Sequence, residues 1–175
     1  MTESEIFEAV TGSGSTDFAT VVRILNQHSG WCLIGGLAVN CYVEPVYTLD
    51  ADIVVVSSDL PEIKNELEAA DFSIEEFPHS LNATMAGSDL RIQFTTDPRY
   101  QDFLNNTTPH EVLGQKVPVA ALANVVRGKV WVWGDASRRL SKRKKDELDL
   151  IRIAEKYPEL RGMMPPTIIQ QLEAN

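Results

Sequence analysis

The sequence is poor in the residues that build disulfide frameworks or zinc sites. Its 175 residues include only two cysteines and three histidines. Cys32 and Cys41 lack the CxxC spacing of zinc and redox sites, so we expect both to be reduced thiols of the core. The histidines are scattered without the spacing of metal ligands. Each is therefore expected to be structural or exposed rather than catalytic.

Long apolar runs and an excess of positive charge are also absent. No apolar segment approaches the ~20 residues of a membrane span, and the segment Met1–Glu5 lacks the basic start of a signal peptide. We therefore expect a cytoplasmic protein with no membrane partner. The 25 acidic residues outnumber the 16 basic ones, giving a net charge of −9. This balance argues against a general nucleic-acid coat protein.

The composition and the hydrophobic patterns instead predict one globular domain of mixed structure. Hydrophobic residues make up 43% of the chain and charged residues 23%, as in ordinary globular domains. The predicted fold class is α+β, with a mixed β-sheet and helices packed on one face and at one end. The domain is expected to span residues 1–175 and to be helical from about 119 to 175.

Periodicity and turn signals place the individual elements. Strands are expected at 31–34, 50–56, 72–77, 81–86 and 90–95. Helices are expected before residue 11 and at 17–28, 37–43, 60–70, 98–104, 119–130, 142–156 and 167–173. Pro118 is expected just ahead of the helix at 119–130. Residues 11–16 are expected to form a flexible loop, with Thr16 or Asp17 as a helix cap.

The most informative motif is a glycine pair followed by two carboxylates. Gly35-Gly36 separates a short apolar strand from a helix start, and a glycine turn that enters a helix exposes backbone N–H groups that can bind phosphate. Asp50 and Asp52 head a second apolar strand. Side chains two residues apart on a strand point to the same face, so the two carboxylates can share cations. Taken singly, the motifs are also compatible with an ordinary turn and a solvated strand start.

These residues resemble the signature of the nucleotidyltransferase superfamily that shares the DNA polymerase beta palm. That signature is an apolar residue, Gly-Gly or Gly-Ser, about a dozen residues, and then Asp-x-Asp or Asp-x-Glu between apolar positions. Within the superfamily the chain is most similar to the abortive-infection toxin branch, which has a Gly-Gly-x-Ala start, a Thr-x-Asp-x-Asp strand and a later Lys-Asp-x-x-Asp helix. The matching segments are Gly35–Ala38, Thr48–Asp52 and Lys145–Asp149, and the resemblance covers roughly residues 31–157.

The resemblance implies a metal-dependent enzyme that uses a nucleoside triphosphate (NTP). Asp50 and Asp52 would ligate one or two magnesium ions (Mg²⁺) that bridge the nucleotide phosphates. Gly35 and Gly36 would contact the phosphates through their backbone. The superfamily commonly adds a third carboxylate from a later strand, for which Asp89 is the candidate in this chain.

Asp89 and Arg91 belong to the strand expected at 90–95 or to its start. If Asp89, Arg91 and Gln93 alternate onto the active-site face, Asp89 supplies the third acid and Arg91 a partner for phosphate or for an acid. Alternatively, Asp89 belongs to a Gly-Ser-Asp turn, where aspartate favours local hydrogen bonds. A missing third acid would put catalysis in doubt, though not nucleotide or metal binding.

Further candidates come from the C-terminal helices. The toxin branch commonly has a helical lysine that reaches toward the nucleotide phosphates. Lys129 is the closest match and Arg127 the reserve, although a lysine near a helix end also compensates the helix dipole. Asp146 is the matching acid of the later helix, where it would orient Lys129 or a substrate hydroxyl. Lys145 beside it is a candidate phosphate ligand.

A basic stretch at residues 138–145 precedes Asp146 in this otherwise acidic chain. It holds six of the 16 lysines and arginines. We expect it to attract the phosphates of a nucleotide or of RNA. The alternative is a solvated helix start whose charges pair with neighbours three or four residues away. In that helix Leu148 is expected to face the core, with Asp146 and Asp149 on flanking faces.

Three functions are consistent with these motifs. The first is transfer of a nucleoside monophosphate from an NTP to an acceptor, with RNA or a protein hydroxyl preferred, in a toxin that has a cognate antitoxin. The second is a catalytically silent module that binds NTP and metal. The third is a small-molecule transferase of the aminoglycoside type, since an acidic surface suits a cationic acceptor.

Overall fold

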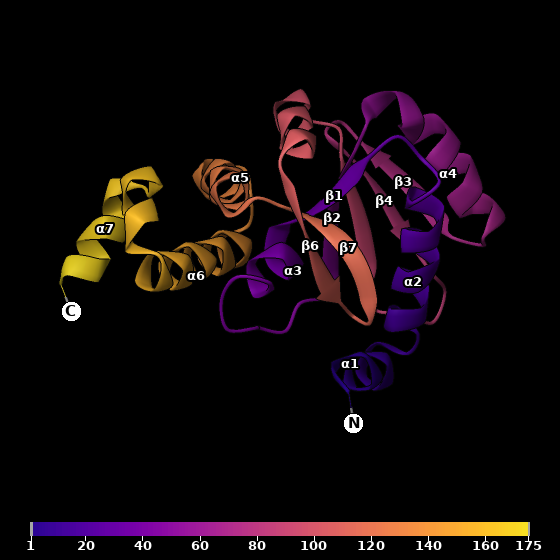
Figure 1. Cartoon of the computed structure of the whole chain (residues 1–175), viewed down its shortest axis with the longest axis horizontal. Coiled ribbons are helices and arrows are strands. Elements are labelled where there is room, and N and C mark those ends of the chain that lie inside the picture. Colours follow the sequence, from indigo (N-terminus) through magenta and orange to yellow (C-terminus); the bar gives the residue numbers. More distant parts are fainter. Residues whose placement is uncertain (1, 175) are drawn as a thin grey trace.

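A mixed β-sheet of seven strands forms the centre of the computed structural model (Figure 1), which describes residues 2–174. The strands are β1 (Trp31–Ile34), β2 (Asp50–Val55), β3 (Ser73–Phe77), β4 (Ser80–Thr84), β5 (Arg91–Thr95), β6 (Thr107–Val112) and β7 (Gln115–Ala120). They lie in the order β3-β4-β5-β2-β1-β7-β6. The pairs β1/β7 and β2/β5 are parallel, and the other neighbours are antiparallel. The predicted α+β class with a mixed sheet is confirmed.

Helices flank this sheet. They are α1 (Glu3–Thr11), α2 (Gly14–Leu25), α3 (Gly35–Asn40), α4 (Leu60–Ala69), α5 (Leu122–Gly134), α6 (Leu140–Lys156) and α7 (Pro166–Glu173), with 3-10 turns at Ser57–Asp59, Pro98–Asn105 and Pro158–Met163. Figure 1 shows α2 and α4 on one side of the sheet and α3, α5, α6 and α7 on the other.

No helix within residues 2–174 is long and apolar enough to cross a membrane. Met1 and Asn175, the ends of the predicted domain, lie outside the described residues.

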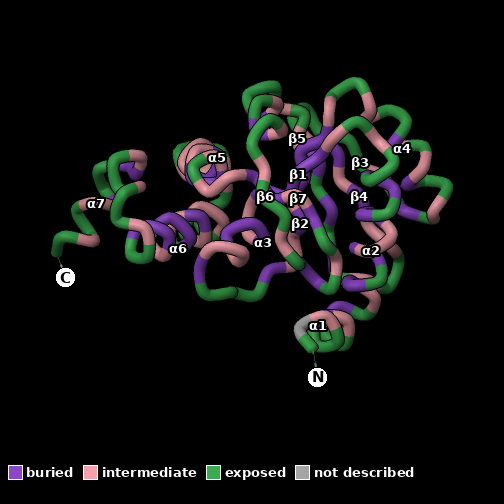
Figure 2. The backbone as a smooth tube through the Cα atoms, in the orientation of Figure 1, coloured by how far each residue is buried: buried purple, intermediate pink, exposed green. Residues whose placement is uncertain are grey.

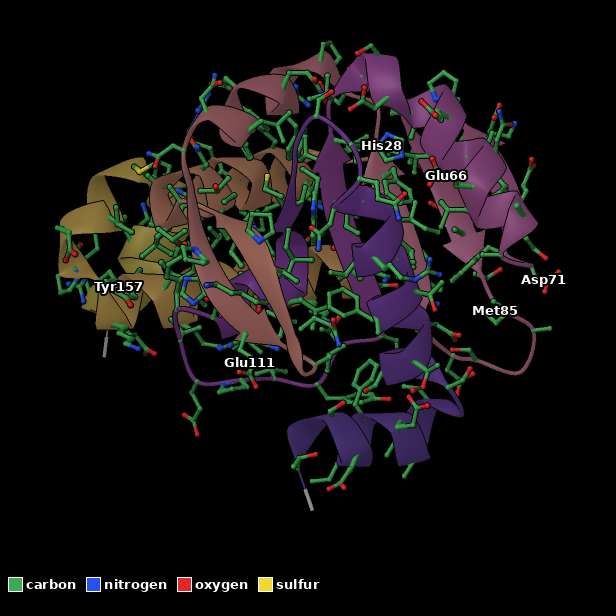
Figure 3. The ribbon with its side chains drawn as sticks, turned by 45° about the vertical axis from the view of Figure 1, so that its right-hand side comes forward. His28, Glu66, Asp71, Met85, Glu111 and Tyr157 are labelled. Atoms are coloured by element: carbon green, nitrogen blue, oxygen red, sulfur yellow. The ribbon has the colours of Figure 1, made fainter. Side chains whose placement is uncertain are left out.

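The core lies where the central strands meet α2 and α4, as the buried segments in Figure 2 show. Leu33, Ile53 and Phe94, from three adjacent strands, are fully buried. At the edge of this layer His28 Nε2 lies 3.0 Å from Glu66 Oε1, which joins the segment after α2 to α4 (Figure 3). Burial of apolar surface between the sheet and these helices is the main stabilising contribution to the fold.

The two cysteines agree with the predicted reduced state, because neither forms a disulfide. Cys32 is fully buried in β1, and burial raises the pKa of its thiol to about 12. Cys41, just after α3, is half-buried. A thiol that stays protonated is a weak nucleophile, so Cys32 behaves as a core side chain.

The helix predicted at 119–130 begins too early. Residues up to Ala120 belong to β7, which forms an antiparallel hairpin with β6, and the helix α5 begins only at Leu122. Leu113 and Gly114, at the tip of the hairpin, both have positive φ, as tight hairpin turns require. Pro118 was expected to start the helix but pairs with Pro109 in the hairpin. Alternating burial of Val117 and Val119 is the strand pattern that competes with the helical one.

The flexible loop predicted at 11–16 is also corrected. The helix α2 already begins at Gly14 and needs no cap from Thr16 or Asp17. Instead the Glu8 carboxylate of α1 accepts hydrogen bonds from the backbone N–H groups of Ser15 (2.7 Å) and Thr16 (3.0 Å). Those N–H groups belong to the first turn and would otherwise lack a partner. Local sequence signals do not predict this cap, because the capping carboxylate belongs to the preceding helix.

Phe94 provides a test of the core. We expect Phe94→Ala to lower the free energy of unfolding by about 3–5 kcal/mol, because it removes a fully buried ring from the central strand β5. Phe77→Ala is the matched control, since Phe77 lies on the outer strand β3 and is 45% exposed. Urea unfolding of both variants gives the comparison. Equal losses would contradict the assignment of β5 to the core.

Candidate active site

A cleft of about 660 Å³ opens over the start of β2. Its walls come from the β1–α3 turn, from β2, from the ends of β4 and β5, and from α5 and α6. Seven of the residues predicted from the sequence line it: Gly35, Gly36, Asp50, Asp52, Lys129, Lys145 and Asp146. Asp89 and Arg91 are not among the lining residues. Segments up to about a hundred residues apart therefore meet at one site, as the predicted nucleotide site requires.

The β2 strand aims Asp50 and Asp52 into this cleft. Ala51 and Ile53 alternate with them along the strand and are fully buried on the opposite face. Because successive strand residues point to opposite faces, burial of the apolar pair fixes the direction of the acidic pair. The predicted arrangement of both carboxylates on one face is therefore what the strand adopts.

Gly35 brings the β1–α3 turn against Asp52. Its φ is +69°, a conformation that side chains rarely adopt, and a Cβ placed there would lie 2.1 Å from Asp52 Oδ2. Gly36, by contrast, would bring a Cβ 3.4 Å from Thr48 Oγ1, an ordinary contact. The first glycine is thus required by both the backbone conformation and the close approach.

Two cations hold the Asp50 carboxylate. Arg91 Nε lies 2.7 Å from Oδ1, and Lys142 Nζ lies 2.8 Å from Oδ2. Arg91 is placed by the sheet, since it is the direct neighbour of Asp50 in the parallel β2/β5 pair. Burial alone would raise the pKa of Asp50, but Lys142 and Arg91 hold that pKa below its ordinary value. Of the two roles predicted for Arg91, the structure shows the contact with an acid.

Asp52 has a different environment. No hydrogen bond or ion pair reaches its carboxylate from any other residue in the range 2–174. Burial raises the pKa of Asp52 to about 6, and the negative charge of Asp50 adds to the rise, while Lys129 and Lys142 oppose it from a distance. The two neighbouring acids therefore differ, one neutralised by contact and one lacking a close partner.

The structure separates Asp89 from this pair. Asp89 is exposed just before β5, and its backbone N–H donates to the Thr11 carbonyl. The residue beside Asp52 in the β2/β5 pair is Gln93, which also lines the cleft. An amide thus stands at the strand position where a third carboxylate would face the cleft.

Lys129 lies at the centre of a buried charge network between α5 and α6. Its ammonium is 2.9 Å from Asp146 Oδ1 and 2.7 Å from Asp149 Oδ2. Arg138 and Arg152 contact the same two carboxylates at 3.2 and 2.8 Å. Burial alone would lower the pKa of Lys129, but the two aspartates raise it above its ordinary value. Lys129 and Asp146 are therefore in contact, as predicted, although neither was expected to be so deeply buried.

The face of α6 that packs inward differs from the prediction. Leu148, expected in the core, is 47% exposed, whereas Asp146 and Asp149 are buried. The ion pairs with Lys129 stabilise the two acids in that position, so a charged pattern replaces the apolar one on part of the helix. Leu150 and Ile153 provide the apolar contacts.

The basic stretch at 138–145 divides into cleft residues and surface residues. Arg138, Lys142 and Lys145 line the cleft, and Lys145 Nζ donates to Thr48 Oγ1 at 3.2 Å. Lys144 is exposed and pairs with Glu147 on its own helix. The sequence indicated the stretch as a whole, but it did not single out Lys142 or Arg138. The three-residue spacing of Lys142 and Lys145 on α6 is a signal that could have identified Lys142, whereas Arg138 precedes the helix and has no such periodic signal.

The carboxylate pair would suit a magnesium ion whose remaining ligands are water molecules and the phosphates of a bound substrate. No group of three or more potential ligands among His, Cys, Asp and Glu occurs in residues 2–174. Magnesium is commonly held by one or two carboxylates, with phosphates and waters completing its shell. Asp50 and Asp52 offer that donor set, and the unpartnered carboxylate of Asp52 has oxygens available for a cation.

Comparison with known proteins bears on the fold. No protein-family model matches the sequence, and a search of curated proteins gives no match. Solved structures do match. The lincosamide antibiotic adenylyltransferase LnuA, with lincomycin bound, is 12% identical over 77% of this chain and 94% of its own, with a TM-score of 0.53. The chain has the nucleotidyltransferase fold.

Other nucleotidyltransferase structures agree. ANT(2'')-Ia, in complex with adenylyl-2''-tobramycin, is 13% identical over 90% of this chain and 98% of its own, with a TM-score of 0.59. An antigenic nucleotidyltransferase-like protein from Paracoccidioides brasiliensis is 13% identical over 87% of this chain and 93% of its own, with a TM-score of 0.51. The superfamily fold predicted from the motifs is therefore supported, whereas the toxin branch stays a prediction.

The glycine turn of this nucleotidyltransferase fold can be tested directly. We expect Gly35→Ala to cost about 1–3 kcal/mol in the free energy of unfolding, because of its positive φ and its overlap with Asp52. Gly36→Ala is the control and should cost less than about 1 kcal/mol, since its Cβ meets only ordinary contacts. Denaturant unfolding measures both. A Gly35→Ala protein as stable as Gly36→Ala would contradict this geometry.

Asp52 should make stability depend on pH. Its folded pKa of about 6 lies above its ordinary value, so the native state binds more protons in this range. The stabilisation is full below roughly pH 4 and is lost as pH rises through about 6. Relative to Asp52→Asn, the wild-type protein should lose up to about 3 kcal/mol between those limits. Urea unfolding at a series of pH values without metal tests this, and parallel profiles would contradict the burial of Asp52.

Proposed function

We propose that this protein is a metal-dependent nucleotidyltransferase, which moves a nucleoside monophosphate from an NTP to an acceptor hydroxyl. The observation that carries the proposal is the convergence of Asp50 and Asp52 on one cleft that Arg138, Lys142 and Lys145 also line. Two adjacent carboxylates suit a divalent cation, and the cations around them suit phosphates. The nucleotidyltransferase fold of the chain supports the same reaction class.

Each side chain has a role in this proposal. Asp50 and Asp52 hold magnesium, which when bound activates the attacking hydroxyl and neutralises charge on the transferred phosphoryl group. The Gly35-Gly36 backbone lies beside these acids and can approach a phosphate, and Lys145 adds a positive charge from α6. Lys129 and Asp146 are committed to each other, so we assign them to positioning α5 and α6 rather than to contact with the reacting atoms.

The acceptor is the finer part of the proposal. An RNA or protein hydroxyl is favoured by the exposed charge of Arg139, which adjoins the cleft residue Arg138 at the entry to α6. A small-molecule acceptor is favoured by the relatives in fold, one solved with lincomycin and one with adenylyl-2''-tobramycin. A role as a toxin with a cognate antitoxin rests on the motif resemblance, and a protein partner encoded beside this chain would support it.

A second candidate is a silent module that binds NTP and metal without turnover. Gln93 favours it, because this amide stands beside Asp52 where a third carboxylate would complete the metal ligands. Asp89 is exposed and does not line the cleft, so we do not include it among the catalytic residues. Binding without transfer would distinguish this candidate from the enzyme.

The decisive experiment supplies magnesium and each labelled NTP in turn, with total RNA, the protein itself or aminoglycoside and lincosamide drugs as acceptors. We expect label transfer by the wild type and a loss of at least about a hundredfold in Asp50→Ala and Asp52→Ala, since each removes a metal ligand. Asp102→Ala is the control, because Asp102 is an acid outside the cleft that pairs with Arg127.

The outcomes separate the candidates. Transfer by the wild type and by Asp102→Ala alone establishes the enzyme, and the labelled acceptor gives its class. Magnesium-dependent NTP binding without transfer to any acceptor would support the silent module. Equal magnesium-dependent NTP binding by the wild type, Asp50→Ala and Asp52→Ala would contradict both the enzyme and the silent module, because both require these two acids as metal ligands.

A further inference from the structure

The helix α6 reaches across the cleft to the start of β2. Lys142 Nζ contacts Asp50 Oδ2 at 2.8 Å, and Lys145 Nζ contacts Thr48 Oγ1 at 3.2 Å. These residues are about a hundred positions apart in sequence, and the two lysines lie on one face of the helix because they are three residues apart. The contacts tie the helical side of the cleft to the strand that carries the two acids.

Lys142 occupies a position at which a metal ion would compete with it. Both oxygens of Asp50 are already bound, Oδ1 by Arg91 and Oδ2 by Lys142. A divalent cation that arrives by itself must displace the Lys142 ammonium or lie close to it. Either case costs free energy, because like charges repel and the displaced ammonium loses a charge-assisted hydrogen bond.

A triphosphate changes this balance. It would bring several negative oxygens into the same cleft and so offer the Lys142 ammonium new partners when it leaves Asp50. The Lys142 side chain is 33% exposed, which leaves it room to turn toward the cleft. The favourable step is therefore the joint arrival of metal and triphosphate, whereas the arrival of metal alone is unfavourable.

Other cations of the cleft are less suited to this exchange. Lys129 is buried between two aspartates, and Arg138 contacts one of them. Lys145 donates to a neutral hydroxyl, and Arg99, which also lines the cleft, pairs with Asp97, so neither competes for Asp50. Arg91 contacts Asp50 but does not line the cleft. Of the described cleft residues, Lys142 is thus the cation paired with a proposed metal ligand.

We propose that Lys142 is an internal counter-ion that excludes free metal from Asp50 and becomes a triphosphate ligand when metal and nucleotide bind together. The proposal rests on the proposed function, since it concerns the same site, and it adds a residue and an order of binding to it. Lys142 would make the binding of the two ligands cooperative, so that metal and triphosphate each favour the other.

The test uses manganese alone and a premixed 1:1 complex of manganese and inorganic tripolyphosphate, which has no base and so avoids the question of nucleotide preference. Dissociation constants are measured by calorimetry for the wild type, Lys142→Met and Lys142→Arg. Lys144→Met is the matched control. It removes the same charge two residues further along the helix, and the Lys144 side chain is exposed and does not line the cleft. Thermal unfolding checks that each variant is folded.

We expect Lys142→Met to move the two affinities in opposite directions. Manganese alone should bind about tenfold more tightly, because the competing ammonium is gone, and the complex about tenfold more weakly, because a phosphate ligand is lost. Lys142→Arg and Lys144→Met should stay within about threefold of the wild type. In the wild type itself, the complex should bind more tightly than manganese alone, a requirement that holds even if Lys142→Met fails to fold.

Two results would overturn the proposal. One is a Lys142→Met protein in which both affinities are unchanged or move in the same direction. The other is a wild-type protein that binds manganese alone as tightly as it binds the complex. Asp52→Asn separates these failures from a failure of the proposed function. If Asp52→Asn weakens binding of the complex, the site stands without the role of Lys142, and if it binds the complex as the wild type does, the metal site itself is wrong.

Discussion

The alternation of side chains along β2 is the constraint on which the site depends. Ala51 and Ile53 are fully buried in the layer beneath the sheet, so Asp50 and Asp52 must face the cleft. The strand cannot shift by one residue without placing two carboxylates in the apolar core, where unpaired charge is costly. The same packing that stabilises the sheet therefore fixes the position of the acids.

Charge compensation around these acids comes from distant parts of the chain. Arg91 lies beside Asp50 because β2 and β5 are parallel neighbours, and Lys142 reaches it from α6. Deeper in the same wall, Lys129 pairs with Asp146 and Asp149. A buried ion network of this kind contributes little net stability compared with apolar packing, but the loss of one member is costly. Its effect here is to define how α5 and α6 lie against the cleft.

The sequence correctly predicted the two strands that flank the glycine turn and carry the acidic pair. It missed the elements whose sequence pattern fits both a helix and a strand. The strands containing Trp31 and Asp50 were correct, because each combines a short apolar run with clear turn signals. The β6–β7 hairpin was missed because Pro118 and the apolar residues after it also fit a helix start. The start of α2 was misplaced because its cap, Glu8, comes from another helix.

The sequence by itself determined the chemistry of the acidic pair and the glycine turn, because spacing along a strand and a turn are local properties. Tertiary structure alone decided which charges meet them. It selected Lys142 from a basic stretch, buried Asp146 and Asp149 in place of Leu148, and left Asp89 outside the cleft. Those outcomes depend on how α6 packs across the sheet, and contacts between residues about a hundred positions apart leave no periodic signal in the chain.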